Sequence, residues 1–138
     1  MAEIVHRERR DAQWAVDLIR RLKREGKIKQ KELLSHIRKL PSHIQTSGLA
    51  QTLLFYRQKQ RNVAKALAQR VLGRDEKNEK NEKNEKNEDI VTAAVMALVE
   101  DANKFRMKTR EALAAAQWLK RVAEVELERE VKAEKSEK

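Results

Sequence analysis

The sequence predicts an all-α fold, a compact single-domain bundle of about five to six helices over residues 1–138. Composition is the first observation, because helix-favouring residues abound while the chain has only three glycines and one proline. Length is the second, since 138 residues is an ordinary size for one domain with one hydrophobic core. The third is that apolar residues recur at helical spacing in segment after segment.

The first expected helix covers residues 2–24 and is amphipathic. Its apolar stripe follows a spacing of three and four residues: Ala12, Ala15, Val16, Ile19 and Leu22, widened by Trp14 and Leu18. At about 100° per residue, the opposite side gathers five arginines: Arg9, Arg10, Arg20, Arg21 and Arg24. This side of the helix is therefore strongly basic.

A corner is expected around the only proline of the chain. Residues 31–39 form a second amphipathic helix, and residues 40–47 form a short helical restart. Pro41 suits the first turn of such a restart, because a proline there removes no needed amide donor. Gly48 would end the restart and turn the chain into the next helix.

The remaining helices follow from apolar spacing and from glycine. The segment 49–59 is apolar on nearly every side, which is typical of a buried helix at the centre of a bundle. Residues 62–72 form a shorter helix that stops at Gly73. Apolar spacing resumes over residues 89–105, and the last long helix runs from about residue 109 past residue 131. We expect residues 132–138 to fray.

A low-complexity segment, residues 74–88, separates these helices, and in it the triplet EKN occurs four times in succession. The triplets contain no apolar residue, so they can bury nothing. Glutamates four residues before lysines favour a helix, whereas the repeated asparagines oppose one. We expect a charged, solvated linker.

Positive charge is concentrated in the first half of the chain. Residues 1–73 hold 17 Lys and Arg against 6 Asp and Glu, whereas residues 90–138 hold 10 against 9. Such one-sidedness predicts a surface that faces a polyanion, while a merely solubilising surface would not explain it. The candidate phosphate-binding residues are Arg20, Arg21, Arg24, Lys27, Arg38, Lys39, Arg57, Lys59, Arg61 and Lys65.

A surface of this kind binds the phosphate backbone and does not read the bases. Few aromatic side chains are expected to be free for stacking on bases, because all of them lie on or beside apolar stripes: Trp14, Phe55, Tyr56, Phe105 and Trp118. Sequence-specific recognition is therefore not expected.

No pattern in the chain predicts an enzyme. The absence of cysteine excludes a thiol nucleophile, a disulfide and a cysteine zinc site. The three histidines, His6, His36 and His43, occur without an HExxH motif or a convergent set of carboxylates. Three scattered glycines cannot build a loop that cradles a nucleotide. We expect no catalytic residue, no metal and no cofactor.

No segment approaches the roughly 20 apolar residues of a membrane span, and the first residues lack the apolar run of a signal peptide. We expect a soluble, cytoplasmic protein that has no membrane partner.

Two blocks of the sequence resemble one known family. KLPSHIQTSGLAQTLLFYRQK, residues 39–59, matches it at Leu40, Pro41, Ile44, Gly48, Leu49, Thr52, Leu53, Phe55 and Lys59. RMKTREALAAAQWLKRVAE, residues 106–124, matches it at Thr109, Glu111, Ala112, Leu113, Trp118, Leu119, Lys120, Arg121 and Ala123. The family that they resemble is the small α-helical subunit of the Cmr complex, the type III-B CRISPR effector. Departures from its pattern are found at Ser47, Ala115, Ala116 and the EKN triplets.

The resemblance implies a non-catalytic structural subunit of a ribonucleoprotein in antiviral defence. Such a subunit stacks with copies of itself beside the repeat-family backbone subunits, together with the large subunit, and against CRISPR RNA and target RNA. The basic residues named above would then hold RNA, and Lys59 belongs both to the family pattern and to the basic surface.

Two other functions remain open at this point. One is a free-standing helical protein that binds nucleic acid non-specifically. The other is an adaptor for acidic partners or for anionic membrane, which the arginines of the first helix alone would permit.

Deleting residues 76–87 is expected to change the free energy of unfolding by less than about 0.5 kcal/mol, because the segment has no apolar surface to bury. Urea denaturation of the full chain and of the deletion variant measures the difference. A cooperative loss above about 2 kcal/mol would show instead that the segment packs on the helices.

Overall fold

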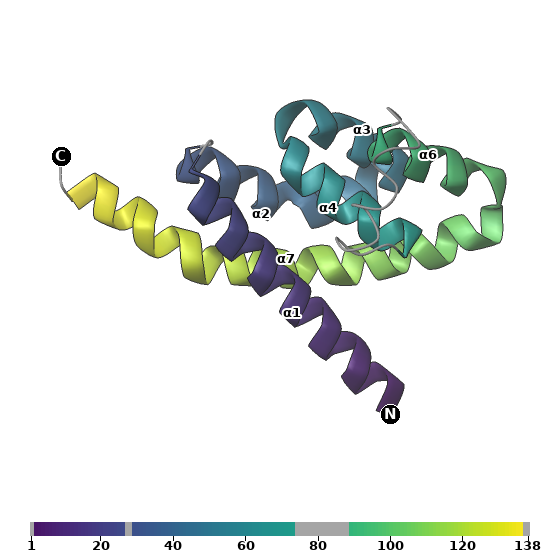
Figure 1. Ribbon diagram of the computed structural model, residues 1–138, viewed down its shortest axis with the longest axis horizontal. Coiled ribbons are helices and arrows are strands. Elements are labelled where there is room, and N and C mark those ends of the chain that lie inside the picture. Colours follow the sequence, from purple (N-terminus) through teal and green to yellow (C-terminus); the bar gives the residue numbers. More distant parts are fainter. Residues whose placement is uncertain (1, 27–28, 74–88, 137–138) are drawn as a thin grey trace. The chain divides into compact units, whose positions relative to one another are not determined.

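The computed structural model describes residues 2–26, 29–73 and 89–136, and these form an all-α fold without a strand. This confirms the expected fold class. The helices of these residues are α1 (Ala2–Glu25), α2 (Gln30–Ser47), α3 (Leu49–Lys59), α4 (Arg61–Leu72), α6 (Ile90–Glu100) and α7 (Ala102–Ser136) (Figure 1). The EKN segment expected at 74–88, like Lys27, lies outside the described residues.

The chain divides into two compact units. Unit 1 consists of residues 1–42 and 113–138, and unit 2 consists of residues 43–112. The helices α2 and α7 are continuous (Figure 1), so each contributes one part to each unit. A single domain over 1–138 and fraying of 132–138 stay predictions, although the backbone of α7 is helical as far as Ser136.

The core of unit 1 is built from α1, the first part of α2 and the second part of α7. Its buried apolar residues are Ala15, Leu18, Ile19, Leu22, Leu33, Leu34, Ile37, Leu40, Ala115, Ala116, Leu119, Ala123 and Leu127. The apolar stripes expected for the first two helices are thus confirmed in part, since Ala12 and Val16 of the first stripe, like Trp14 beside it, are only half-buried.

Ion pairs join the three helices of unit 1. Lys23 Nζ on α1 lies 3.3 Å from Glu126 Oε2 on α7. Arg38 on α2 approaches two other carboxylates of α7, with Nη2 2.8 Å from Glu128 Oε1 and Nε 3.7 Å from Glu124 Oε1. Glu124 and Glu128 stand one helical turn apart on one side of α7, and Glu126 faces another side. α7 therefore supplies the acid for basic residues on both neighbouring helices.

The core of unit 2 is formed by α3, α4 and α6, which pack on one another (Figure 1). Its buried apolar residues are Ile44, Leu49, Leu53, Tyr56, Val63, Ala64, Ala66, Leu67, Ala68, Val71, Val91, Ala94, Leu98 and Ala112. The buried Thr52 satisfies its hydroxyl within α3, where Oγ1 donates to the Gly48 carbonyl at 2.7 Å. Burial raises the pKa of the Tyr56 phenol, which therefore stays neutral.

The expectation of a helical restart at Pro41 is wrong, because the proline lies inside the continuous helix α2. A proline within a helix removes one backbone hydrogen bond. Its neighbours Leu40 and Ile44 are buried, at 0% and 1% exposure, and Pro41 is itself buried. Packing on both sides of the proline therefore outweighs the missing bond.

The corner lies at Gly48, between α2 and α3. Gly48 has φ 84° and ψ 159°, a combination that is open essentially to glycine alone. Its amide still donates to the Ile44 carbonyl at 3.1 Å, and its carbonyl accepts from the Thr52 amide at 3.1 Å. The chain thus changes direction at one residue without losing these backbone hydrogen bonds.

The expectation that segment 49–59 is buried all round is wrong in part. The residues of α3 that face the core are Leu49, Thr52, Leu53 and Tyr56. The other side of the helix is open, since Leu54 is 44% exposed and Phe55 is 41% exposed. Periodicity could not show this, because apolar residues lie on both sides of the helix.

The boundary between the last two helices also differs from the expectation. α6 ends at Glu100 instead of residue 105, and α7 begins at Ala102 instead of residue 109. Asp101 causes this break, because its Oδ1 accepts from the amides of Asn103 at 3.0 Å and Lys104 at 3.2 Å, as an N-cap does. Val99, in the last turn of α6, is 61% exposed.

Replacing Gly48 by alanine is expected to lower the free energy of unfolding by about 1–3 kcal/mol, the cost of a side chain in this backbone conformation. No heavy atom lies within 4 Å of the added Cβ, so the loss reports backbone strain and no clash. Gly73→Asn is the control, because Gly73 is left-handed at φ 72° and ψ 23°, where asparagine is tolerated. Urea denaturation measures the free energy of unfolding of both variants. Equal losses for the two variants would contradict the assignment of the Gly48→Ala loss to backbone strain.

Candidate nucleic-acid interface

A long part of the sequence contains no carboxylate. Between Glu32 and Asp75 there is no Asp or Glu, whereas this stretch holds eight basic residues: Arg38, Lys39, Arg57, Lys59, Arg61, Lys65, Arg70 and Arg74. The second part of α2 and all of α3 and α4 come from this stretch. Any ion pair that these helices form must take its acid from elsewhere in the chain.

The basic set of unit 2 consists of Arg57, Lys59, Arg61 and Lys65. These residues occupy the last turn of α3 and the beginning of α4, on either side of Gln60. The backbone bends at Gln60, which has φ −142° and ψ 74° and is buried. Arg57, Lys59 and Arg61 are exposed, and Lys65 is half-buried. The bend therefore gathers four positive charges over a short stretch of chain.

One member of this set already has an acidic partner. Arg57 Nε lies 2.6 Å from Asp89 Oδ2, and its Nη1 lies 3.4 Å from Thr92 Oγ1. Asp89 is also the N-cap of α6, since its Oδ1 accepts from the Val91 amide at 2.9 Å. Arg57 therefore holds α3 to the start of α6. Within the described part of the chain, Lys59, Arg61 and Lys65 form no ion pair.

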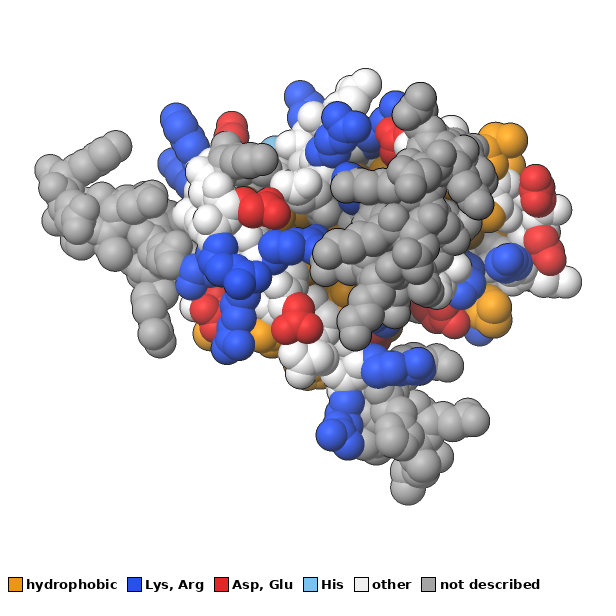
Figure 2. Space-filling view, viewed as in Figure 1, with side chains coloured by type: hydrophobic (Ala, Val, Ile, Leu, Met, Phe, Trp, Pro, Cys, Tyr) orange, Lys and Arg blue, Asp and Glu red, His pale blue; other side chains and the backbone are white. Residues whose placement is uncertain are grey.

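The basic set of unit 1 consists of Arg20, Arg21 and Arg24 on α1 and Arg38 and Lys39 on α2. Arg20, Arg24 and Lys39 are exposed, and Arg21 is half-buried. Arg38 forms the two ion pairs with α7 described above, so much of its charge is offset there. Figure 2 shows Lys and Arg side chains, in blue, standing on the surface, with acidic side chains, in red, beside several of them.

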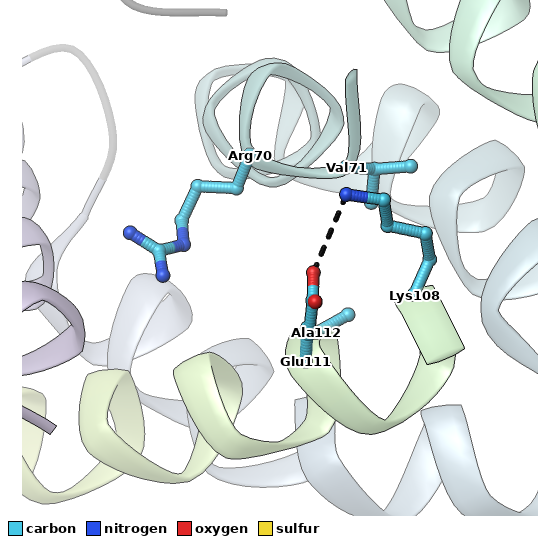
Figure 3. A pocket seen from close by; sticks show the side chains of 5 residues that line it. All are labelled: Arg70, Val71, Lys108, Glu111 and Ala112. Atoms are coloured by element: carbon cyan, nitrogen blue, oxygen red, sulfur yellow. Dashed lines mark hydrogen bonds and ion pairs between the residues drawn. The ribbon is translucent and has the colours of Figure 1, made fainter. Parts of the chain in front are cut away.

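An open depression of about 30 Å³ lies between the end of α4 and the start of α7, within unit 2. Its lining includes Lys108 and Glu111, whose Nζ and Oε2 lie 3.4 Å apart. Figure 3 shows Arg70 directed away from this pair. The depression is smaller than the sites of drug-sized ligands, and the one carboxylate in its lining is already paired. It offers no arrangement for acid–base chemistry.

Among the described residues, no group of three His, Asp or Glu side chains could hold a metal ion. His36 is half-buried, and the side chain of His6 lies outside the described residues. In that same part of the chain, no helix is long and apolar enough to cross a membrane.

The structure adds an aromatic cluster that the sequence reasoning missed. The rings of His43 and Phe55 stack, with centroids 5.2 Å apart and planes at 20°. Tyr56 meets both in a T-shaped manner, at 5.7 Å from His43 and 5.5 Å from Phe55. The expectation that Phe55 is a core residue is wrong, since 41% of it is exposed. Consecutive residues of a helix point in different directions, so Phe55 and Tyr56 could both be buried only if α3 were covered on two sides. The pair Phe55–Tyr56 was therefore the sequence signal that one of the two rings could be exposed.

One protein family has a model that matches the chain. It is described as CRISPR-associated protein (Cas_Cmr5), and it matches residues 7–126. The matched range contains both blocks of the resemblance and all residues of the two basic sets. No curated protein and no solved structure gives a significant match.

Replacing Asp89 by alanine is expected to lower the free energy of unfolding by about 1–2 kcal/mol, because it removes the cap of α6 and the partner of Arg57. Asp89→Ser keeps a capping oxygen and should lose less than about 1 kcal/mol. Urea denaturation of the two variants and of Arg57→Ala separates the contributions. Equal losses for Asp89→Ala and Asp89→Ser would mean that the cap contributes nothing.

Proposed function

Because the chain belongs to the CRISPR-associated Cas_Cmr5 family, we propose that it is a non-catalytic structural subunit that holds guide or target RNA in a cytoplasmic antiviral effector. Family membership makes the chain a subunit of the CRISPR Cmr complex, in association with other subunits of that complex. The contact with RNA is the part that we infer from the residues.

The stretch without carboxylates is the observation that carries this proposal. From Leu33 to Arg74 every charged side chain is basic. A surface that only kept the protein soluble would mix both signs. A phosphate chain, in contrast, is repelled by each carboxylate that stands near it and attracted by each Lys or Arg.

The position of Arg61 supports the same conclusion. It is the first residue of α4, and the first turn of α4 contains no acidic residue. The amino end of a helix carries partial positive charge and favours an anion, so an arginine there gains nothing from its own helix. An RNA phosphate would be favoured by the guanidinium, by Lys59 before it and by the helix end together.

The proposed contacts work through charge and not through base recognition. Lys59, Arg61 and Lys65 in unit 2, and Arg20, Arg21, Arg24 and Lys39 in unit 1, would each neutralise phosphates and release counterions. Lys27 belongs to the same proposal from the sequence alone. Arg38 and Arg57 would add to the field, while their ion pairs hold the helices that carry the other residues.

Contacts with proteins need a different surface. On α6 and the start of α7, three large apolar side chains are exposed: Met96 at 54%, Val99 at 61% and Met107 at 51%. Hydrophobic side chains, in orange, reach the surface where these helices meet (Figure 2). Exposed apolar groups of this kind are typical of protein contacts. We propose that neighbours in the complex, among them copies of this chain, the repeat-family backbone subunit and the large subunit, use such surfaces.

Changing Lys59, Arg61 and Lys65 to Gln is expected to weaken RNA binding by about tenfold or more. The salt dependence of binding should flatten, by about 0.7 units of slope for each phosphate of single-stranded RNA that the variant no longer neutralises. Changing Arg20, Arg21 and Arg24 to Glu tests the set on α1 in the same way. The measurement is RNA affinity of the reconstituted complex at several salt concentrations, with circular dichroism to confirm helicity.

A triple variant of α7, with Lys104, Arg106 and Arg110 changed to Gln, is the matched control, because it removes the same charge elsewhere in unit 2. It should bind RNA nearly as the wild type does. Unchanged affinity and slope in both test variants would contradict the proposal and would assign these residues to a protein neighbour.

A further inference from the structure

We propose that Phe55 is a stacking platform for one unpaired nucleobase of RNA, whose phosphate lies on Lys59. The inference rests on the proposed function that the chain binds RNA, and it adds a contact to the base where the basic residues touch only the backbone. The ring of Phe55 is exposed although it belongs to the aromatic cluster with His43 and Tyr56.

Phe55 is held in place on one side and open on another. His43, from the end of α2, stacks on it at 5.2 Å, and Tyr56 meets it edgewise at 5.5 Å. Tyr56 is itself 1% exposed and anchored in the core of unit 2. A ring fixed in this way loses little conformational freedom when a flat ligand stacks on it. Phe55 remains 41% exposed. A base that stacked on its open side would continue the stack that His43 begins.

Lys59 stands next to this ring on the same helix. Residues four apart lie on one face of a helix, one turn from each other, so Lys59 and Phe55 are neighbours on the surface of α3. Lys59 is exposed, and it forms no ion pair with any residue that the structure describes. This face of α3 thus offers one cation for a phosphate and one aromatic ring for the attached base.

The charge around the cluster favours a nucleotide over an apolar peptide. α3 contains no carboxylate, and its last turn is basic. Beside Phe55, α3 exposes one other large apolar side chain, Leu54 at 44%, whereas the more exposed Met96, Val99 and Met107 lie on α6 and α7, near the acidic Glu100 and Asp101. Surfaces that bind single-stranded nucleic acid usually combine cations with aromatic side chains. The cations contact the phosphates, and the aromatic rings stack on the bases.

The test uses the reconstituted complex and two RNA strands of equal length and charge, one with bases and one abasic throughout. Phe55→Leu keeps an apolar side chain but removes the aromatic face, and Phe55→Trp keeps it. We expect Phe55→Leu to weaken binding of the strand with bases by about 5-fold to 150-fold, the range for the loss of one stacked base. Binding of the abasic strand and the salt slope should not change. Phe55→Trp should bind both strands as the wild type does.

Met96→Ala is the control for the loss of exposed apolar surface elsewhere in unit 2, and it should leave both affinities unchanged. Thermal unfolding of each variant confirms that the fold persists. A 2-aminopurine base in the strand adds a direct reading, since its fluorescence falls when it stacks, and this fall should be absent with Phe55→Leu.

Equal affinity of Phe55→Leu and wild type for the strand with bases would overturn the stacking site while leaving the proposed function intact. An equal loss for both strands would overturn it as well, because the effect would then be indirect. If the wild type binds neither strand, the proposed function and this site fall together. Loss of assembly with other subunits at unchanged RNA affinity would assign the exposed ring to a protein interface instead.

Discussion

The uneven distribution of carboxylates along the chain is the constraint on which the rest of the structure depends. The stretch from Leu33 to Arg74 provides most of α2 and all of α3 and α4, yet it has no acid of its own. Its ion pairs therefore reach to distant residues, from Arg38 to Glu124 and Glu128 and from Arg57 to Asp89. Lys59, Arg61 and Lys65 form no ion pair with any of the described residues.

Helix ends account for much of the remaining architecture. Asp89 begins α6 and Asp101 begins α7, each by accepting backbone amides with its side chain. Gly48 and Gly73 end helices with positive φ, at 84° and 72°. Asp89 thus has two functions, because it caps α6 and also pairs with Arg57. Together these two contacts position the end of α3. The geometry of the basic set in unit 2 follows from these local contacts.

The sequence was sufficient where its local signals did not conflict. The stripe of α1 and the stop of α4 at Gly73 were predicted because apolar spacing and glycine agreed. The prediction failed at Pro41, where burial of Leu40 and Ile44 outweighs the poor helix propensity of proline. It failed at Phe55 because periodicity cannot decide which of two apolar sides finds a partner. The pairing of Arg38 with Glu128 could not be predicted either, since it depends on tertiary contact between residues far apart in the sequence.

Unit 1 is made from both ends of the chain, residues 1–42 and 113–138, whereas unit 2 is one uninterrupted stretch between them. During synthesis the contacts of unit 2 become available early, because their partners are close in sequence. The first helices leave the ribosome before their partners on α7 exist, since the carboxylates that pair with Lys23 and Arg38 belong to Glu124, Glu126 and Glu128. Formation of unit 1 is therefore a late step of folding. Until α7 is complete, the nascent chain exposes apolar side chains that favour aggregation.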